Sequence, residues 1–261
     1  YLTYNISFKR TYMSLSKKHA VVTGGGTGIG LAIANALYAE GAMVTIMGRN
    51  KDRLAEATKN KPRMNIQTVD VTDHLSVKEA FNEVSRIEAI SILVNNAGAA
   101  LSIPFQKTSY EAWQQMINVN LTSVYLTINS ILEDIKSASH GRIINIASTA
   151  GLEGYAYTSA YCAAKHGVIG LTKSLALELS GTDTTINSIC PGFTNTDIVT
   201  IAIKNIMKKT GRTKEEALSG MLSSAGQKRL VEPSEIAAEV IRLCEPVNDI
   251  INGQSIVIDG T

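Results

Sequence analysis

Short runs of apolar, largely β-branched residues alternate with longer amphipathic stretches along most of the chain. Several short runs have apolar residues at consecutive positions, which is typical of parallel strands buried on both faces. The longer stretches repeat their apolar residues at the helical period. The pattern predicts seven strands, at residues 19–23, 43–47, 66–70, 91–95, 142–147, 185–190 and 255–259. It predicts helices at residues 29–40, 51–59, 75–88, 110–136, 158–180 and 233–244.

This regular alternation predicts the fold class. Parallel strands joined through helices place those helices on both faces of one sheet. No Ser/Gly-rich or Pro-rich linker divides the chain, so we expect a single α/β domain with a doubly wound, parallel, seven-stranded sheet. Ligands of such folds bind outside the carboxyl ends of the strands. Functional residues are therefore expected directly after the strands.

Residues 196–230 interrupt the alternation, because they read as two helices joined at Gly211 with no strand between them. The segment follows a predicted strand end, so it could cover the site as a substrate lid. A surface hairpin of two helices explains the pattern equally well. Both interpretations stay open at the level of the sequence.

The charge and composition of the chain restrict the classes of partner that it could bind. Residues 1–18 carry four basic side chains and no acidic one, whereas the remainder of the chain is nearly neutral. Binding of nucleic acid requires a clustered basic face, so none is expected as a partner. No apolar stretch approaches the roughly 20 residues that span a bilayer, so we expect no membrane. We interpret residues 1–16 as an N-terminal extension and residues 17–261 as the folded domain.

The cysteines and histidines show no metal-binding pattern. The three cysteines are far apart without a CxxC pair, and the four histidines are scattered. We expect no metal site and no disulfide framework, which is typical of a cytoplasmic protein.

A glycine-rich segment, VVTGGGTGIG, joins the first strand to the first helix. Its glycines Gly24, Gly28 and Gly30 have the spacing GxxxGxG. Such a loop brings the backbone close to a pyrophosphate, while the free N–H groups of the helix N-terminus face the anion. The position of the loop in the chain therefore predicts a dinucleotide site in a Rossmann-like fold.

The end of the second strand bears on the choice of cofactor. An acidic residue there would accept a hydrogen bond from the 2′-hydroxyl of the adenosine ribose and repel a 2′-phosphate. This chain has Gly48 and Arg49 instead, and a guanidinium can pair with a phosphate. We therefore favour NADP(H), with NAD(H) as the alternative if Arg49 is only a solvated residue at the start of a helix.

The stretch YCAAK places Tyr161 and Lys165 four residues apart, so both lie on one face of a helix. Alone, such a pair is more often a core aromatic beside a solvated lysine. Ser148 precedes Tyr161 by thirteen residues, and Asn120 lies further upstream. The four residues together favour a catalytic interpretation.

The motifs resemble those of the classical short-chain dehydrogenases/reductases. TGGGTGIG, DVTD (70–73), NNAG (95–98), YCAAK and PGFTNT (191–196) occur in that family's order, and the resemblance covers residues 17 to 261. It implies that the chain interconverts a carbonyl and a secondary alcohol by hydride transfer with NAD(P)(H). It implies the catalytic residues Asn120, Ser148, Tyr161 and Lys165. It implies the cofactor-binding residues Gly24, Thr27, Gly28, Ile29, Gly30, Arg49, Asp70, Val71, Asn96, Ala97, Gly98, Tyr161, Lys165, Pro191, Gly192, Thr194 and Thr196.

The implied roles are chemically consistent. Tyr161 would exchange a proton with the substrate oxygen, but a free phenol has a pKa of about 10. We expect Lys165 and the positive nicotinamide to lower that pKa. Ser148 would donate a hydrogen bond to the substrate oxygen. By the resemblance, Asn120 would hold a water molecule that connects Lys165 to solvent.

The substrate is a small-molecule carbonyl or alcohol whose identity stays open. The sequence resembles 3-oxoacyl-[acyl-carrier-protein] reductases, which favours an NADP(H)-dependent 3-oxoacyl thioester reductase acting on a CoA or acyl-carrier thioester. At the places where carrier-dependent relatives tend to carry arginines, this chain has Ser139 and Thr182, and the nearby Arg142 is an uncertain substitute.

Two alternatives to this function remain. The long segment 196–230 is similar in layout to the lid of 3-hydroxybutyrate dehydrogenases, which use NAD, so the alternative is an NAD-dependent dehydrogenase of a 3-hydroxy acid or 3-hydroxyacyl-CoA. A non-catalytic dinucleotide-binding sensor is a remote second alternative, since such proteins usually lose the tyrosine or the lysine. The resemblance also implies a homotetramer, paired through the helices at 110–136 and 158–180.

Overall fold

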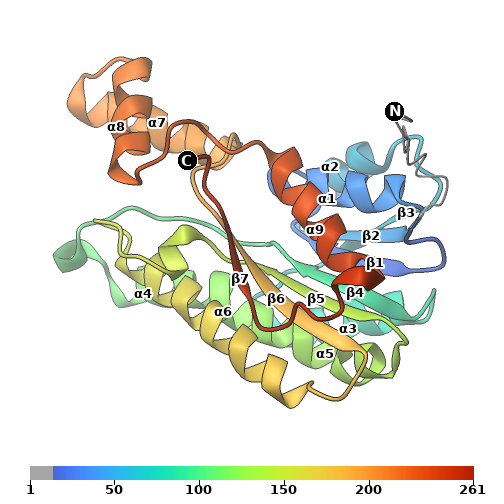
Figure 1. Cartoon of the computed structure of the whole chain (residues 1–261). Coiled ribbons are helices and arrows are strands. Elements are labelled where there is room, and N and C mark those ends of the chain that lie inside the picture. Colours follow the sequence, from blue (N-terminus) through green and yellow to red (C-terminus); the bar gives the residue numbers. More distant parts are fainter. Residues whose placement is uncertain (1–13) are drawn as a thin grey trace, which may run out of the picture.

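The computed structural model describes residues 14–261 and contains one sheet of seven parallel strands in the order β3-β2-β1-β4-β5-β6-β7. Strands β1 to β3 run outward in one direction and β4 to β7 in the other, so the order reverses between β1 and β4 and the sheet is doubly wound (Figure 1). The strands are β1 (His19–Thr23), β2 (Met43–Gly48), β3 (Met64–Thr68), β4 (Ile90–Asn95), β5 (Gly141–Ile146), β6 (Thr184–Pro191) and β7 (Ser255–Ile258). The predicted fold class is confirmed.

Helices cover both faces of the sheet. Buried residues of α1 and α9 pack on one face, and those of α3, α5 and α6 pack on the other (Figure 1). The helices are α1 (Gly28–Ala39), α2 (Lys51–Thr58), α3 (His74–Ser85), α4 (Tyr110–Ile117), α5 (Ser123–Ser137), α6 (Ser159–Glu178), α7 (Asp197–Thr210), α8 (Lys214–Ser224) and α9 (Pro233–Cys244). No helix of the described chain is long and apolar enough to cross a membrane.

Two predicted elements differ from the structure. The strand expected at 66–70 is Met64–Thr68, because the chain leaves the sheet after Thr68 and Asp70 forms a turn with Thr72. The helix expected at 110–136 is interrupted by a π-helical turn over Asn118–Thr122. The wider turn buries Asn120, whose side chain donates a hydrogen bond to the backbone oxygen of Met116. Short π-helical turns of this kind occur frequently at functional sites.

The expected N-terminal extension, residues 1–16, lies mostly outside the described residues. Its last part packs against the domain: Leu15 is buried, and its N–H donates to the backbone oxygen of Glu40 at 3.0 Å. The start of the folded unit therefore includes Leu15.

The segment between β6 and α9 forms the predicted helical hairpin. Helices α7 and α8 are joined at Gly211, whose positive φ of 71° ends α7 in the left-handed conformation. A capping box of Thr213 and Glu216 starts α8. The hairpin has its own small apolar core and extends beyond the carboxyl edge of the sheet (Figure 1).

A buried polar network connects the middle of the sheet to α6. Asn95 on β4 donates to Asn145 on β5 at 2.9 Å, and Asn145 donates to the hydroxyl of Thr172 on α6 at 2.9 Å. Thr172 also shares a hydrogen bond of 2.8 Å with Ser188 on β6. All four side chains are buried, so each requires these partners to offset its desolvation. The network therefore fixes the position of α6 on the sheet.

Arg142 lies at the amino end of β5, opposite to the expected site. Its guanidinium is fully buried, forms an ion pair with Asp249 and donates to the backbone oxygen of Asp183 at 3.1 Å. It also bonds to Nδ1 of His140, whose Nε2 contacts the backbone oxygen of Cys244 at 2.7 Å. Arg142 therefore fastens the C-terminal segment to the sheet. The sequence left open whether it takes part in substrate binding, and the structure places it at the end of β5 opposite to Ser148.

Candidate active site

All of the expected site residues lie at or near the carboxyl edge of the sheet. The glycine loop joins β1 to α1, and Thr27 is the N-cap of α1. Arg49 follows β2, Asp70 and Val71 follow β3, and residues 96–98 follow β4. Ser148 follows β5, residues 191–196 follow β6, and Tyr161 and Lys165 lie in the first turns of α6.

The glycine loop is held tightly against the end of β4. Asn96 donates from Nδ2 to the backbone oxygens of Thr23, at 3.0 Å, and Gly24, at 3.2 Å. A Cβ on Gly30 would lie 2.3 Å from the oxygen of Gly24 and 2.5 Å from Nδ2 of Asn96. Only glycine fits there, so the first turn of α1 lies directly against the loop.

The loop after β6 faces the glycine loop. A Cβ on Gly28 would lie 3.4 Å from Cγ2 of Thr196, the residue that precedes α7. Bare backbone at the N-terminus of α1 therefore lies beside the hydroxyl residues of the segment 191–196. This cradle suits the pyrophosphate of a dinucleotide, because helix N–H groups without internal partners bind anions.

The groups expected to choose the cofactor are Arg49 and Asp70. Arg49 is exposed and forms no ion pair with any residue of the described chain. The pKa of Asp70 is below its ordinary value, mainly because the backbone N–H and hydroxyl of Thr72 donate to its carboxylate at 2.9 and 2.7 Å. The charge of Arg49 lowers that pKa further, so the two side chains share one electrostatic environment.

Ser148, Tyr161 and Lys165 come together between β5 and α6. The hydroxyl of Ser148 lies near enough to Tyr161 to lower the pKa of its phenol. The Nζ of Lys165 lies 5.7 Å from the centroid of the Tyr161 ring and donates to the backbone oxygen of Ile146 at 2.8 Å. Lys165 is 5% exposed, so this is not a solvated lysine. The shared helix face predicted from the sequence is present, and it points into the protein.

The expected lowering of the tyrosine pKa by Lys165 together with the positive nicotinamide stays a prediction. Burial raises the pKa of Tyr161 above its ordinary value, and the hydroxyl of Ser148 opposes this only in part. Burial also lowers the pKa of Lys165 to about 8. With a pKa of about 8 the lysine is still mostly protonated at pH 7, so its ammonium is available to stabilise a phenolate.

Asn120 anchors the loop after β4. Its Nδ2 donates to the backbone oxygen of Ala99 at 2.9 Å, and its Oδ1 accepts from the N–H of Ala99 at 3.2 Å. A Cβ on Gly98 would lie 2.7 Å from that Oδ1. Asn120 therefore shapes the floor of the site, whereas its expected water-mediated link to Lys165 stays a prediction.

Two aromatic residues that the sequence did not single out border the same site. The hydroxyl of Tyr155 donates to Oγ1 of Thr149 at 3.0 Å, directly after Ser148. Its ring makes an edge contact with Phe193, at a centroid distance of 6.2 Å. Phe193 also packs against the apolar core of the α7–α8 hairpin. The pair therefore connects the hairpin to the catalytic side, and only the tertiary contact reveals it.

Gln227 is a second residue that the sequence did not indicate. Its Oε1 accepts from the N–H of Phe193 at 2.7 Å, and its Nε2 donates to the backbone oxygens of Phe193 and Arg229 at 3.3 and 3.2 Å. A Cβ on Gly192 would lie 2.6 Å from that Oε1. The buried amide therefore fixes the end of the hairpin to the loop after β6.

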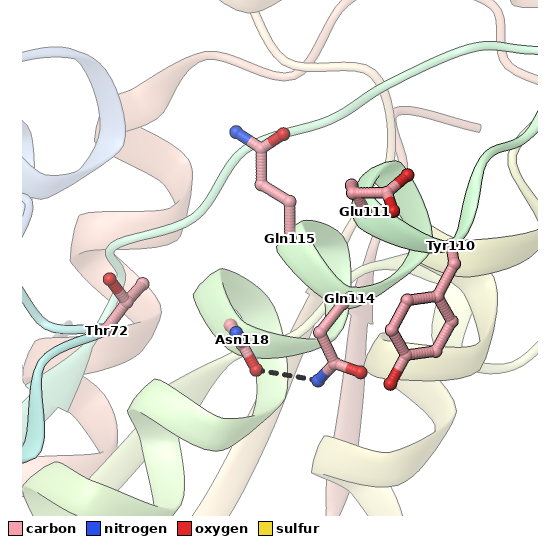
Figure 2. A pocket seen from close by; sticks show the side chains of 6 residues that line it. All are labelled: Thr72, Tyr110, Glu111, Gln114, Gln115 and Asn118. Atoms are coloured by element: carbon pink, nitrogen blue, oxygen red, sulfur yellow. Dashed lines mark hydrogen bonds between the residues drawn. The ribbon is translucent and has the colours of Figure 1, made fainter.

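A hollow of about 450 Å³ lies beside the expected adenine end. Thr72, two residues after Asp70, borders it on one side, and α4 forms the other side with Tyr110, Gln114 and Asn118 (Figure 2). Gln114 donates to Asn118 at 3.0 Å. None of the four expected catalytic residues borders this hollow, so it adjoins the site and is not its reactive part.

The cysteines of the chain are buried and unpaired. Burial raises the pKa of Cys190 to about 11 and that of Cys244 to about 12, so both thiols are protonated at neutral pH. Within residues 14–261 no group of three or more His, Cys, Asp or Glu side chains is arranged to hold a metal ion.

Comparison with known proteins agrees with this geometry. The family described as short chain dehydrogenase matches residues 18–206. The chain is 35% identical over 251 residues to the D-beta-hydroxybutyrate dehydrogenase of Rhizobium meliloti, covering 93% of this chain and 97% of that protein. It is 34% identical to the 3-oxoacyl-[acyl-carrier-protein] reductase of Aquifex aeolicus, with 95% and 98% covered. The crystal structure of a variant of actinorhodin polyketide ketoreductase with NADPH matches at a TM-score of 0.88 and 31% identity, covering 94% of this chain and 96% of that one.

The chain therefore belongs to the short-chain dehydrogenase family, and the expected resemblance is confirmed. It is an NAD(P)-dependent oxidoreductase that acts on CH–OH groups. The residues of the glycine loop, together with Asn96 and Thr196, fit a dinucleotide because they leave its phosphates a cradle of bare backbone.

Replacing Gln227 by Leu should weaken cofactor binding. The change keeps most of the volume but leaves the buried N–H of Phe193 without its partner, at a cost of about 1–3 kcal/mol, whereas the carbonyl of Phe193 keeps the N–H of Val231. We expect a several-fold higher dissociation constant for the nicotinamide cofactor in a fluorescence titration. The exposed Gln254, replaced by Leu, is the matched control and should bind as the wild type does. Unchanged affinity in the Gln227 variant would contradict the role of the amide in holding the loop.

Replacing Lys165 by Met should stabilise the fold while it abolishes turnover. The pKa of Lys165 is about 8 in the folded chain and 10.5 in the unfolded chain. Burial therefore disfavours the ammonium by about 3 kcal/mol. The unfolded chain binds more protons between these values, so wild-type stability rises with pH from about 8 to 10.5 and the penalty is complete below pH 8. Urea unfolding at pH 7 and pH 10 measures this. A variant that is less stable than wild type at pH 7 would show that Lys165 holds the fold together.

Proposed function

We propose that this protein is an NADP(H)-dependent reductase of 3-oxoacyl thioesters, with Asn120, Ser148, Tyr161 and Lys165 as its catalytic residues. The bound nicotinamide cofactor supplies the hydride. The observation that supports the assignment of these residues is that Tyr161 lies beside both Ser148, which lowers the pKa of its phenol, and the buried Lys165, whose Nζ is 5.7 Å from the tyrosine ring. The relatives named as 3-oxoacyl reductases support the substrate class.

In the proposed reaction the substrate carbonyl oxygen takes the place between the two hydroxyl groups. Ser148 donates a hydrogen bond to that oxygen and stabilises the negative charge that develops on it. Tyr161 transfers its phenolic proton to the same oxygen, which completes the alcohol. Because burial raises the pKa of Tyr161, the phenol carries its proton at neutral pH, as reduction requires. Lys165 then stabilises the phenolate until a proton returns from solvent.

The charges beside the site favour a thioester over a free hydroxy acid. The segments that border the catalytic side chains, residues 99–104, 149–158 and 192–203, contain no basic side chain and two acidic ones, Glu153 and Asp197. A free carboxylate would find no counter-ion on these segments, and its desolvation would be costly. The same segments expose apolar side chains, among them Tyr157, Ile198 and Ile201. A neutral, partly apolar acyl group matches this lining.

The second candidate is an NAD-dependent dehydrogenase of a 3-hydroxy acid. The similarity to the D-beta-hydroxybutyrate dehydrogenase of Rhizobium meliloti favours it. The acidic character of the bordering segments opposes it, and so does Arg49 at the end of β2. We therefore rank it below the thioester reductase.

Replacing Arg49 by Ala should reduce kcat/KM for NADPH by about 10- to 100-fold, because one charge-assisted hydrogen bond to the 2′-phosphate is worth roughly 1.5–3 kcal/mol. The value for NADH should stay the same. The assay follows acetoacetyl-CoA reduction, and a Tyr161→Phe variant should lose activity while it still binds NADPH. Equal use of the two cofactors by the wild type would refute the assignment of Arg49, and turnover by the phenylalanine variant would refute the mechanism.

We further propose that the protein is a homotetramer. Large apolar side chains are exposed on α5 and α6, at Tyr125 and Leu177, and near the C-terminus at Ile250, which is 92% exposed. Exposed apolar groups of this kind are typical of protein interfaces. Light scattering should give four times the chain mass of 28.0 kDa. Replacing Leu177 or Ile250 by Lys should produce smaller, folded species, and a wild-type monomer would contradict the proposal.

A further inference from the structure

The helical hairpin carries a concentration of positive charge that the rest of the domain lacks. Residues 196–230 have seven basic and three acidic side chains, whereas residues 19–195 and 231–261 together have fourteen basic and twenty acidic ones. Five of the seven lie close together in the chain, from the middle of α7 to the start of α8. They are Lys204, Lys208, Lys209, Arg212 and Lys214.

These five cations are exposed, and within residues 14–261 none of them forms an ion pair. The two other cations of the segment are Lys228 and Arg229. Arg229 is neutralised by a bidentate ion pair with Glu235. Of the two carboxylates in the first turn of α8, Glu216 accepts from the N–H of Thr213 in the capping box, and neither Glu215 nor Glu216 forms an ion pair within residues 14–261. The five cations, which we call the hairpin cations, therefore keep their charge available.

Helix stability explains only part of this arrangement. Lys208 and Lys209 lie in the last turn of α7, where the helix dipole favours a cation. Lys214 is the first residue of α8, where the dipole disfavours it. Lys204 and Lys208 are four residues apart, so their like charges repel each other. No stabilising role in the hairpin itself is therefore found for the other three cations, Lys204, Arg212 and Lys214.

The surface formed by these side chains suits a macromolecule. The hairpin extends outward from the carboxyl edge of the sheet, at the side of the catalytic residues (Figure 1). Its cations are spread over the end of one helix, a turn and the start of the next, and all are exposed. Small-molecule sites are concave and largely enclosed, whereas dispersed charge on a projecting surface steers and orients a protein of opposite charge.

Carrier-dependent relatives tend to carry arginines at the positions of Ser139 and Thr182, but these positions do not provide such a surface here. Ser139 precedes β5 and Thr182 precedes β6. Because the strands are parallel, both positions lie at the amino end of the sheet, opposite to Ser148 within this chain. The hairpin cations, in contrast, follow β6 on the carboxyl side of the sheet, where Ser148 lies.

We propose that the hairpin cations form the docking surface for an acidic carrier protein that delivers the acyl thioester. The proposal rests on the proposed thioester reductase activity. It divides recognition of the substrate between two regions: the acyl group enters the segments without basic side chains, and the acidic carrier contacts α7 and α8. Since exposed charges act mainly on association, the effect should appear in kcat/KM and in its dependence on salt.

The test compares three acetoacetyl thioesters that differ only in what carries them. The carriers are a purified acidic acyl carrier protein, CoA, and the neutral N-acetylcysteamine. The variant combines Lys204→Gln, Lys208→Gln and Lys209→Gln, and its control combines Lys59→Gln, Lys78→Gln and Lys136→Gln on other surfaces. We expect the hairpin variant to lose tenfold or more in kcat/KM with the carrier protein at low salt. Its activity with N-acetylcysteamine thioester should equal that of the wild type, and the control should show no loss with any substrate.

Several outcomes would overturn the proposal. An equal loss with all three substrates would mean that the substitutions damage the site, and an equal loss with CoA and the carrier would mean that the cations bind phosphate groups. No loss would exclude docking at the hairpin. If the wild type reduces none of the thioesters, the proposed function fails, and fluorescence anisotropy then tests docking alone. Salt-sensitive binding of the carrier protein that the hairpin variant lacks would support the surface, and no binding would refute it.

Discussion

The position of α6 on the sheet is the constraint on which the site depends. Tyr161 and Lys165 act only if one face of this helix meets the end of β5, and the helix is twenty residues long with little contrast between its faces. Apolar packing alone would permit it to slide or rotate. The hydrogen bonds of Thr172 with Asn145 and Ser188 remove that freedom, because a shift by one residue would leave buried polar groups unpaired. Thr172 lies two turns after Lys165, so the network sets the orientation of the lysine.

The same principle operates on the cofactor side, where backbone is fixed by buried amides. Asn96 holds the glycine loop, Asn120 holds the loop after β4, and Gln227 holds the loop after β6. Each amide bonds to main-chain groups of a loop that has no regular partner of its own. Loops are the natural place for ligand contacts, but they need such support to be precise. The site is therefore built from loops that side-chain amides hold in place.

The sequence predicted the fold and the location of the site because both follow from local patterns. Buried parallel strands, the glycine loop and the spacing of Tyr161 and Lys165 are visible in short stretches. Gln227, Tyr155 and Phe193 were missed because their importance comes from contacts across 34 or more residues, which no local period encodes. The polar residues inside the strands, such as Asn145, were a usable signal, since a buried amide must have a partner. The sequence does not show how strongly burial raises the pKa of Tyr161, because burial is a property of the folded chain.

Burial shifts the protonation of the two groups proposed to be catalytic, Tyr161 and Lys165. A dry environment raises the pKa of Tyr161 and lowers that of Lys165, so both groups tend toward their neutral forms. At pH 7 the tyrosine keeps its proton, whereas Lys165, with a pKa of about 8, is still mostly charged. A positive nicotinamide beside them would favour the phenolate and thereby the oxidative direction, whereas the neutral reduced ring would leave the phenol protonated and favour reduction. In the proposed mechanism, a nicotinamide bound beside these residues would therefore couple the protonation of Tyr161 to the redox state of the cofactor.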